Sequence, residues 1–179
     1  MIDKELLFNY DMEMNKIYNI TMEDNDSFID NIEEIKEYKN GEWKNNKRKD
    51  NLLFDIKEIP SELNGIQELI GIKEMIGMKG TIVPLKIKHL LKKRDNDEIN
   101  LKTKIKLRTF LGNTILKIVK IRAYIIMKYK DKNKTEVKVK YTIKNLLPKK
   151  ISDKINNLII DKIENNFVIK IDNYLKNYV

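Results

Sequence analysis

The sequence predicts an α+β fold in which an antiparallel sheet of about seven strands packs against a long C-terminal helix. Two observations carry this prediction: apolar and polar residues alternate through most of residues 85–143, and apolar residues recur every three or four positions from Ile151 to Tyr178. Alternation is typical of strands with one buried face, and the second spacing is typical of an amphipathic helix. We take residues 1–179 as a single domain, because the length fits one.

The N-terminal part predicts a strand followed by two short helices. The first segment alternates with apolar residues at Leu6, Phe8, Tyr10 and Met12. Apolar residues at helical spacing in residues 14–36 predict two short helices, separated at residues 24–27, where Asp, Asn and Ser favour helix N-caps. Residues 37–44 and 49–59 are typical of two further strands around the polar turn Asn45-Asn46-Lys47.

Residues 85–143 predict four more strands joined by short polar turns. The inward-facing positions run from Leu85 to Leu91, from Ile99 to Leu107, from Ile115 to Met127 and from Val137 to Ile143. Basic residues occupy many of the alternate positions. The sheet should therefore have one apolar face and one lysine-rich face.

The C-terminal segment predicts one long helix. Pro148 suits a first helical turn, and the apolar stripe that follows spans about 30 residues. At about 1.5 Å per residue this helix would be roughly 45 Å long. A helix of that length with a continuous apolar stripe needs a long sheet to lie against.

Residues 61–80 are apolar but contain four glycines. Two interpretations stay open for this segment. It is either a gate over a cavity that also contacts a membrane surface, or a loop and an extra strand packed on the core. The second interpretation is the simpler one.

Composition excludes several kinds of site. The chain has no Cys and one His, which excludes disulfides, thiolate zinc sites, iron–sulfur clusters and a Cys nucleophile. No apolar run reaches the roughly 18 residues of a membrane span, and no signal-peptide pattern opens the chain. We therefore expect no metal, no cofactor and a cytoplasmic location. Peripheral contact with membranes stays open as an addition to this location.

Residue usage indicates an AT-rich genome. The chain has 32 Lys against 4 Arg, with 21 Asn, 29 Ile and one Ala. Abundant lysine is therefore weak evidence of function, but its position is informative. Residues 1–80 carry a net charge of −7, residues 81–150 carry +16, and residues 151–179 carry none. Codon bias acts on all segments alike and cannot produce this split.

A short motif adds a family resemblance. Tyr38-Lys-Asn-Gly-Glu-Trp43 is followed by a basic residue, Arg48, and by the apolar strand Leu52-Leu-Phe54. The element order over nearly the whole chain resembles the helix-grip fold of the START and Bet v 1-like superfamily. Within it, the motif is most similar to VASt-type lipid-transfer domains. The resemblance implies a curved sheet gripping the C-terminal helix and an apolar ligand, such as a sterol, between them.

The expected cavity would be lined from the inner sheet face and the helix. The candidate lining residues are polar, aromatic or large side chains at these positions: His89, Thr103, Thr109, Met127, Tyr129, Tyr141, Phe167 and Tyr174. A few polar groups in an apolar pocket orient a ligand. The alternative is a core filled by large aliphatic side chains, with no cavity.

His89 lies between Ile87 and Leu91 on the predicted apolar face. A buried polar group without a partner costs roughly 1–3 kcal/mol, so this imidazole needs one. The sequence offers no evident partner that would make it a catalytic base, and no second His or Cys for a metal. We favour a satisfied core histidine, or one at the cavity rim, over a ligand contact.

The lysine-rich face forms a positive surface. Its candidate residues project from three successive strands: Lys104, Lys106, Lys120, Arg122, Lys138 and Lys140. Such a surface attracts anionic lipids or nucleic acid, and the simpler alternative is a solvated face. Proteins that bind single-stranded nucleic acid use aromatic side chains for stacking, and the outward positions offer mainly Tyr124. A membrane surface therefore ranks above nucleic acid, and plain solubility above both.

We expect a non-catalytic protein that binds a hydrophobic ligand such as a sterol or another lipid. Whether it also transfers that ligand stays open. No catalytic residue set emerges, although cyclase-type activity is not excluded by the sequence. The alternative function is an interaction module that uses its basic face without a cavity ligand.

Overall fold

The described part of the chain contains one sheet of seven strands in which the first and last strands are neighbours. The computed structural model describes residues 1–55, 82–107, 119–145 and 149–178. The strands are β1 (Ile2–Tyr10), β2 (Ile35–Lys39), β3 (Lys47–Asp55), β4 (Ile82–Arg94), β5 (Glu98–Leu107), β6 (Val119–Asp131) and β7 (Lys134–Asn145). Their order in the sheet is β1-β7-β6-β5-β4-β3-β2, and every pairing is antiparallel. The predicted seven-stranded antiparallel sheet is confirmed.

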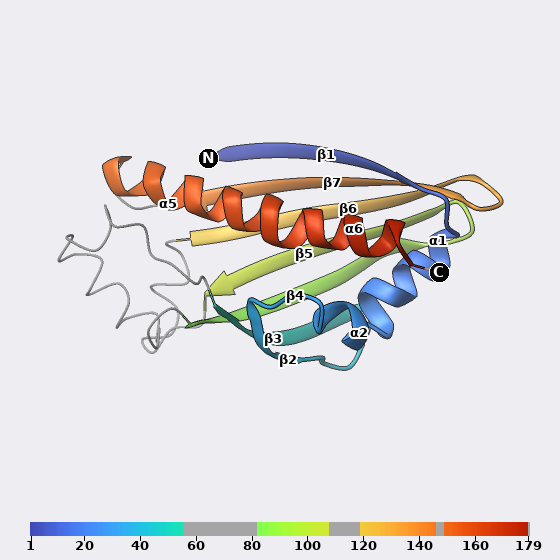
Figure 1. The fold of residues 1–179 in the computed structure, drawn as a ribbon, viewed down its shortest axis with the longest axis horizontal. Helices are drawn as coiled ribbons and strands as arrows, with labels where there is room; N and C mark the ends of the chain where they lie inside the picture. The colour runs from blue at the N-terminus through green and yellow to red at the C-terminus, as the bar shows by residue number, and fades with distance from the viewer. Residues whose placement is uncertain (56–81, 108–118, 146–148, 179) are drawn as a thin grey trace.

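The helices lie on one side of this sheet. After β1 come α1 (Met14–Tyr18), the π-helical segment η1 (Asn19–Glu23) and α2 (Asp26–Ile29). The C-terminal rod consists of α5 (Lys149–Asp161), a π-helical segment η3 (Lys162–Val168) and α6 (Ile169–Lys176). Figure 1 shows this rod crossing the sheet from the N-terminal end of β1 to α1, where the C-terminus lies. Both predictions, short helices after the first strand and a long C-terminal helix, are confirmed.

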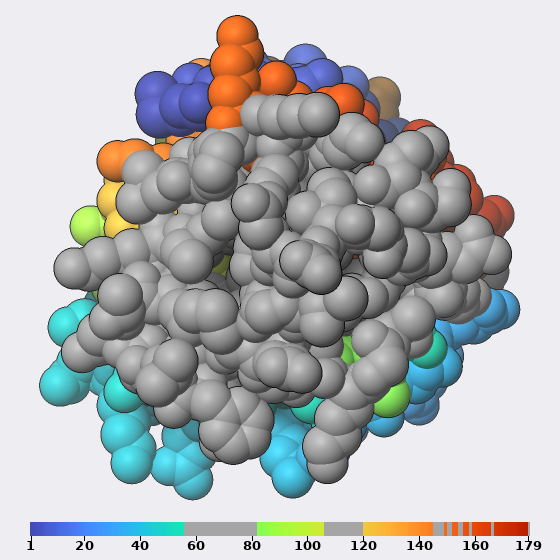
Figure 2. Space-filling model, turned by 90° about the vertical axis from the view of Figure 1, so that its left-hand side faces the viewer, coloured from blue at the N-terminus to red at the C-terminus, as the bar shows by residue number. Residues whose placement is uncertain are grey.

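The two edges of the sheet stay apart. Figure 2 views the molecule from the end where α5 begins, and there β1 lies along the top in blue while β2 and β3 lie along the bottom in cyan. The edge strands β1 and β2 each pair with a single neighbour, so the sheet is open. The C-terminal rod lies over the face between these edges (Figure 1).

The turn between β2 and β3 forms where the sequence predicts it. Asn45 and Asn46 both have positive φ, 49° and 60°, and Lys44 and Lys47 form a bridge on either side of them. Asparagine tolerates this left-handed conformation better than most residues, which favours a two-residue turn. The sequence predicts a strand over residues 37–44 before this turn. In the structure that strand, β2, ends at Lys39, and residues 40–43 form a loop.

Some sequence predictions fall outside the described residues. These are the segment 61–80, the turn at Gly112-Asn113, the candidate Thr109 and Pro148.

Buried apolar side chains form two separate clusters in the described part of the chain. One includes Tyr18, Leu101 and Met127 and lies where α1 and α6 meet the sheet. The other contains Leu52, Phe54 and Ile87 on β3 and β4, with Phe167 of η3 packed against it. The inner face between these clusters holds the candidate site.

Candidate functional site in the inner face of the sheet

A row of polar residues crosses the inner face of the sheet from edge to edge. Register pairs Arg48 with His89, His89 with Thr103, Thr103 with Ala123, Ala123 with Tyr141 and Tyr141 with Lys4. We call these six residues the polar row. Five of the six carry polar side chains, and the exception is the single alanine of the chain.

Apolar rows lie on both sides of the polar row. On one side the register aligns Leu91, Leu101, Ile125, Val139 and Leu6. On the other side it aligns Ile87, Ile105, Ile121, Ile143 and Ile2, with Asp50 at the β3 end. The inner face is therefore apolar with a polar line across its middle, which suits a ligand with a mainly apolar body and a small polar group.

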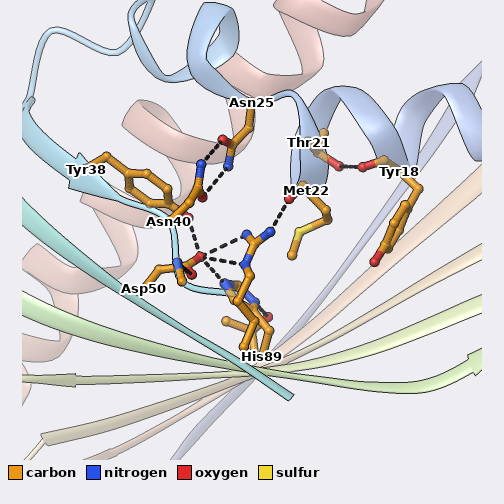
Figure 3. A network of polar contacts seen from close by, with 11 residues as sticks. Tyr18, Thr21, Met22, Asn25, Tyr38, Asn40, Asp50 and His89 are labelled. Carbon is orange, nitrogen blue, oxygen red and sulfur yellow. Dashed lines mark hydrogen bonds and ion pairs between the residues drawn. The ribbon is translucent and has the colours of Figure 1, made fainter. Parts of the chain in front are cut away.

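Asp50 is the centre of a buried hydrogen-bond network (Figure 3). Its side chain is 0% exposed. Its Oδ2 accepts hydrogen bonds from the Tyr38 hydroxyl (2.5 Å), from Arg48 Nη2 (2.8 Å) and from His89 Nε2 (3.1 Å). Its Oδ1 accepts one from the backbone N–H of Gly41 (3.0 Å). A buried carboxylate with this many donors is fully satisfied as an anion.

These contacts decide the charge of Asp50. Burial alone would raise the pKa of the carboxyl, but the hydrogen bonds from His89, Gly41 and Tyr38 and the charge of Arg48 outweigh burial and lower the pKa well below its usual value. Burial, together with the hydrogen bond to this carboxylate, raises the pKa of Tyr38. Asp50 is therefore an anion and Tyr38 a neutral donor throughout the physiological range.

Arg48 ties the network to the helices. Its guanidinium donates to the backbone carbonyl of Met22 in η1, as well as to Asp50 (Figure 3). The Trp43 ring lies 5.1 Å from the Arg48 Cζ, in a cation–π arrangement. Gly41 is required at its position, because a Cβ there would collide with the carbonyl oxygen of Lys49. The motif residues that carry the family resemblance thus build the surroundings of Asp50.

His89 is a satisfied core histidine, which is the interpretation that the sequence favoured. It is 8% exposed, and its Nδ1 lies 2.9 Å from the Thr103 hydroxyl. Because Asp50 accepts at Nε2, the neutral ring carries its proton there and Nδ1 accepts from Thr103. Both nitrogens are engaged, so the ring has no free nitrogen with which to take a proton from a substrate. The sequence showed no partner for His89, and the structure supplies Asp50.

A second polar contact joins the row to the C-terminal rod. The Tyr141 hydroxyl donates to Glu164 Oε1 of η3 at 2.5 Å, and Lys4 Nζ lies 4.0 Å from the same oxygen. Burial and the hydrogen bond to Glu164 raise the pKa of Tyr141. π-Helical turns are often found at functional sites, and this one contacts the polar row at its β7 and β1 end, through Glu164.

Three neighbouring inner-face residues of β6 around Ala123 are only partly buried. Ile99 and Leu101 are 0% exposed and Met127 is 3% exposed, whereas Ile121, Ala123 and Ile125 on the same face of β6 are only partly buried. β6 is an interior strand of the sheet, so neighbouring strands cannot explain this difference. Ala123 has the smallest side chain of the polar row and lies between Thr103 and Tyr141, its two neighbours in that row.

Two hollows lined by described residues lie elsewhere. One of about 400 Å³ lies beside α2 and β2, and one of about 530 Å³ lies between α1 and the end of α6. Neither is lined by a residue of the polar row. Both open beside the short helices.

The other predicted cavity residues lie in different parts of the fold and differ in how deeply they are buried. Met127 is buried in the cluster beside α1, and Phe167 stacks on Phe54 with ring centroids 5.3 Å apart. Tyr174 contacts Phe28, with ring centroids 5.7 Å apart. Tyr129 is 48% exposed. It lies past the last β5–β6 pair, Glu98 with Lys128, so β5 does not cover it.

The predicted basic residues lie on the opposite face of the sheet. Lys104, Arg122 and Lys140 occupy positions that alternate with the buried ones, as do Lys120 and Lys138, and Lys106 pairs with Lys120. However, Lys138 and Lys140 both form ion pairs with Glu5 of β1, at 2.9 and 2.8 Å. The charge of that part of the face is thus partly neutralised.

The sequence reasoning missed the role of Asp50 and of Glu164. Neither residue was among the candidate site residues, and Asp50 is fully buried. The available signal was its position, because Arg48, Asp50, Leu52 and Phe54 share one face of a strand by alternation. An acidic residue on an apolar face, two positions from an arginine, indicates a buried ion pair.

Metal binding and membrane crossing find no support in the described residues. No cluster of three or more His, Asp or Glu side chains that could hold a metal occurs in that part of the chain. Likewise, none of its helices is long and apolar enough to cross a membrane.

Solved structures with this architecture are similar in fold and remote in sequence. A Zhui aromatase/cyclase from Streptomyces sp. R1128 aligns with a TM-score of 0.65 and 9% identity, covering 97% of this chain and 90% of that one. A STAR-related lipid transfer protein from Xanthomonas axonopodis aligns with a TM-score of 0.61 and 8% identity, covering 98% and 86%. A norcoclaurine synthase from Thalictrum flavum aligns with a TM-score of 0.58 and 9% identity, covering 99% and 95%. No family model and no curated protein matches the chain in sequence.

The chain has the helix-grip fold. Its structural neighbours include members of the START/Bet v 1-like superfamily, as the sequence resemblance implied. The narrower similarity to VASt-type domains stays a prediction. Because helix-grip neighbours include both enzymes and a lipid-transfer protein, the fold does not decide whether this chain is catalytic.

Proposed function

We propose that this protein is a single helix-grip domain that binds a hydrophobic small molecule, without catalysis, between its sheet and its C-terminal rod. The observation that carries the proposal is Ala123, a partly exposed alanine on the inner face of an interior strand, with polar neighbours in its own row and apolar rows on both sides. A ligand resting on Ala123 would have apolar contacts in both directions along the strands. The lipid transfer protein among the helix-grip neighbours supports this function by analogy.

The hydrogen-bond directions in the polar row indicate the polar group of the ligand. When the His89 ring is neutral and protonated at Nε2, toward Asp50, the Thr103 hydroxyl donates to Nδ1. The Tyr141 hydroxyl donates to Glu164. Both hydroxyl oxygens therefore retain lone pairs that can accept, and they lie on either side of Ala123. Acceptors suit a ligand that donates, such as an alcohol, better than a carboxylate. A sterol or another lipid alcohol fits this description, and its transfer between membranes in the manner of VASt-type domains is part of the proposal.

A non-catalytic role is supported by the saturation of the groups that could do chemistry. Asp50 is surrounded by donors, and both nitrogens of His89 are engaged. A general base needs a free site within hydrogen-bond reach of the proton that it removes.

The test is ligand binding by the parent and by a variant in which the space is filled. Lipid extraction of the purified protein followed by mass spectrometry should find an apolar alcohol, and a fluorescent sterol should bind. Ala123→Phe should abolish binding of the sterol while the circular dichroism spectrum is retained. Asn100→Phe, which adds bulk on the outer face of the neighbouring strand, is the matched control and should bind normally.

Two polar substitutions test the donor preference. Thr103→Val and Tyr141→Phe should each weaken binding of the sterol about fivefold to tenfold, the effect of one lost hydrogen bond. Binding of a fatty acid of similar size should be weak in the parent. Equal binding of sterol by the parent and by Ala123→Phe would refute the site.

A further inference from the structure

Register places two rows of basic residues side by side on the outer face of the sheet. One row contains Lys49, Lys88, Lys104 and Arg122, on β3 to β6. The other contains Lys86, Lys106, Lys120 and Lys144, on β4 to β7. We call these eight positions the basic face. Neighbouring strands are about 4.8 Å apart, so each row aligns four cationic residues at the closest spacing that a sheet allows.

This arrangement is unfavourable for the folded protein itself. Like charges directly opposite each other on neighbouring strands repel. At the β1 edge the same face carries Glu5, which pairs with Lys138 and Lys140. Among the described residues, Lys49, Lys104 and Arg122 have no such acidic partner. The positive charge without an acidic partner in the described residues therefore includes Lys49, Lys104 and Arg122, away from Lys138 and Lys140.

Tyr124 reports the positive potential of this face. The hydrogen bond from Lys102 lowers the pKa of the Tyr124 hydroxyl, and the charges of Lys102, Arg122 and Lys104 lower it further. The ammonium of Lys102 also lies 4.9 Å from the centroid of the Tyr124 ring. Since this ring already has a cation over it, it is poorly placed to stack on a nucleobase.

The same face of the sheet also carries exposed apolar surface, at its β1 edge. Leu7 of β1 is 54% exposed and pairs in register with Lys138, which pairs in turn with Ile126. A face that combines lysines with an exposed leucine suits a lipid surface, where basic groups contact headgroups and apolar groups reach the acyl boundary. This face is also turned away from the C-terminal rod (Figure 1), so it is free of the helices.

We propose that the basic face docks this protein on membranes that carry anionic lipid headgroups. The proposal is independent of the inner-face ligand, because it involves the opposite face of the sheet. Each basic side chain near such a surface strengthens binding about fivefold, and the effect falls off over roughly 8 Å at physiological salt.

Vesicle co-sedimentation tests the proposal. The parent should bind phosphatidylcholine vesicles that contain about 30 mol% phosphatidylserine and should not bind pure phosphatidylcholine vesicles. The triple variant Lys49→Glu, Lys104→Glu, Arg122→Glu should bind the anionic vesicles at least about a hundredfold more weakly. The control Lys16→Glu, Lys44→Glu, Lys132→Glu makes the same change in net charge at exposed positions off this face and should bind within about threefold of the parent.

A second variant separates lipid from nucleic acid as the occupant. Leu7→Ser should weaken vesicle binding and leave any residual binding of a single-stranded oligonucleotide unchanged. The proposal is overturned if the parent does not bind the anionic vesicles, or if both triple variants lose binding equally. It is also overturned, in favour of nucleic acid, if the parent binds the oligonucleotide more tightly than the vesicles at the same salt concentration and Leu7→Ser has no effect.

Discussion

Asp50 shows how a charged side chain can be placed inside an apolar sheet face. Its donors come from β2, from the loop between β2 and β3, from β3 itself and from β4, so the network fixes the position of the loop as well as the charge. The guanidinium of Arg48 is 3% exposed and depends on Asp50 for its counter-charge. Removing one member of such a pair leaves the other charge buried without compensation.

Asp50→Ala should therefore be strongly destabilising. We expect a loss of about 3–5 kcal/mol in the free energy of unfolding, measured by urea denaturation at neutral pH. Asp55→Ala, on the outer and more exposed side of the same strand, is the control and should lose less than about 1 kcal/mol. Similar losses in the two variants would contradict the buried-pair assignment.

The lowered pKa of Asp50 predicts an acid-sensitive stability. The pKa is lower in the folded state than in the unfolded chain, so the carboxylate stabilises the fold above about pH 4 and this contribution disappears as the pH falls further. Asp50→Asn removes the titration. Its unfolding free energy should be lower than that of the parent at pH 7, and the difference should start to shrink only as the pH falls below about 4. Parallel pH profiles for the two proteins would exclude this role.

The sequence predicted the position of His89 but not its partners. Alternation alone placed His89 and Thr103 on the inner face, because alternation is a local property of each strand. Which residue faces which depends on the register between strands, and Asp50 lies 39 positions from His89. For the same reason Ala123 could not be recognised as the middle of a polar row until β5, β6 and β7 were aligned.

At the scale of elements, the C-terminal rod contacts both buried clusters of the described core. Phe167 of η3 packs on the cluster of β3 and β4, and Leu175 of α6 is buried in the cluster beside α1. Lys170 of α6 pairs with Glu34 before β2, at 2.7 Å. The rod therefore connects parts of the sheet that do not contact each other directly.

Proline within the rod should be highly destabilising. Ile159→Pro removes a hydrogen bond in α5 and introduces a clash with the preceding turn, at a cost of about 3 kcal/mol or more. Lys149→Pro, in the first turn of α5, is the matched control and should be tolerated. Thermal denaturation followed by circular dichroism distinguishes them. A cooperative transition at the parent temperature for Ile159→Pro would show that the rod is dispensable.

The element order was predictable, and the shape of the rod was not. Apolar spacing indicated a continuous helix, and the chain indeed stays helical from Lys149 to Lys176. The π-helical segment in its middle depends on tertiary contacts such as Tyr141 with Glu164, which no local pattern encodes. The exposure of Tyr129 likewise depends on where its partner strand ends.

At the scale of the molecule, the charge split of the sequence becomes a difference between two sides. The basic face lies on the outer side of β3 to β7, and several acidic residues of the N-terminal half lie around α1 and α2. The codon-bias argument predicted that position would matter more than abundance, and the rows on the basic face agree with this.

Salt should stabilise the folded protein. The repulsion within each basic row is screened as ionic strength rises, because the Debye length falls from about 30 Å at 0.01 M to about 10 Å at 0.1 M. The melting temperature should therefore rise over this range. The triple variant Lys49→Glu, Lys104→Glu, Arg122→Glu should show a smaller rise or none, whereas the Lys16, Lys44 and Lys132 variant should behave as the parent does.

The pairing of β1 with β7 has a consequence for synthesis. Ile2 pairs with Ile143, and Tyr10 pairs with Thr135, so the first strand made is joined to the sheet only by one of the last. During translation, at about 5–20 residues per second, the N-terminal strand waits many seconds with its apolar side chains unpaired. A nascent chain that stalls before residue 134 leaves this strand without its partner edge. Folding of this domain should thus be completed only after β7 has left the ribosome, and chaperones that cover exposed strands should raise its yield.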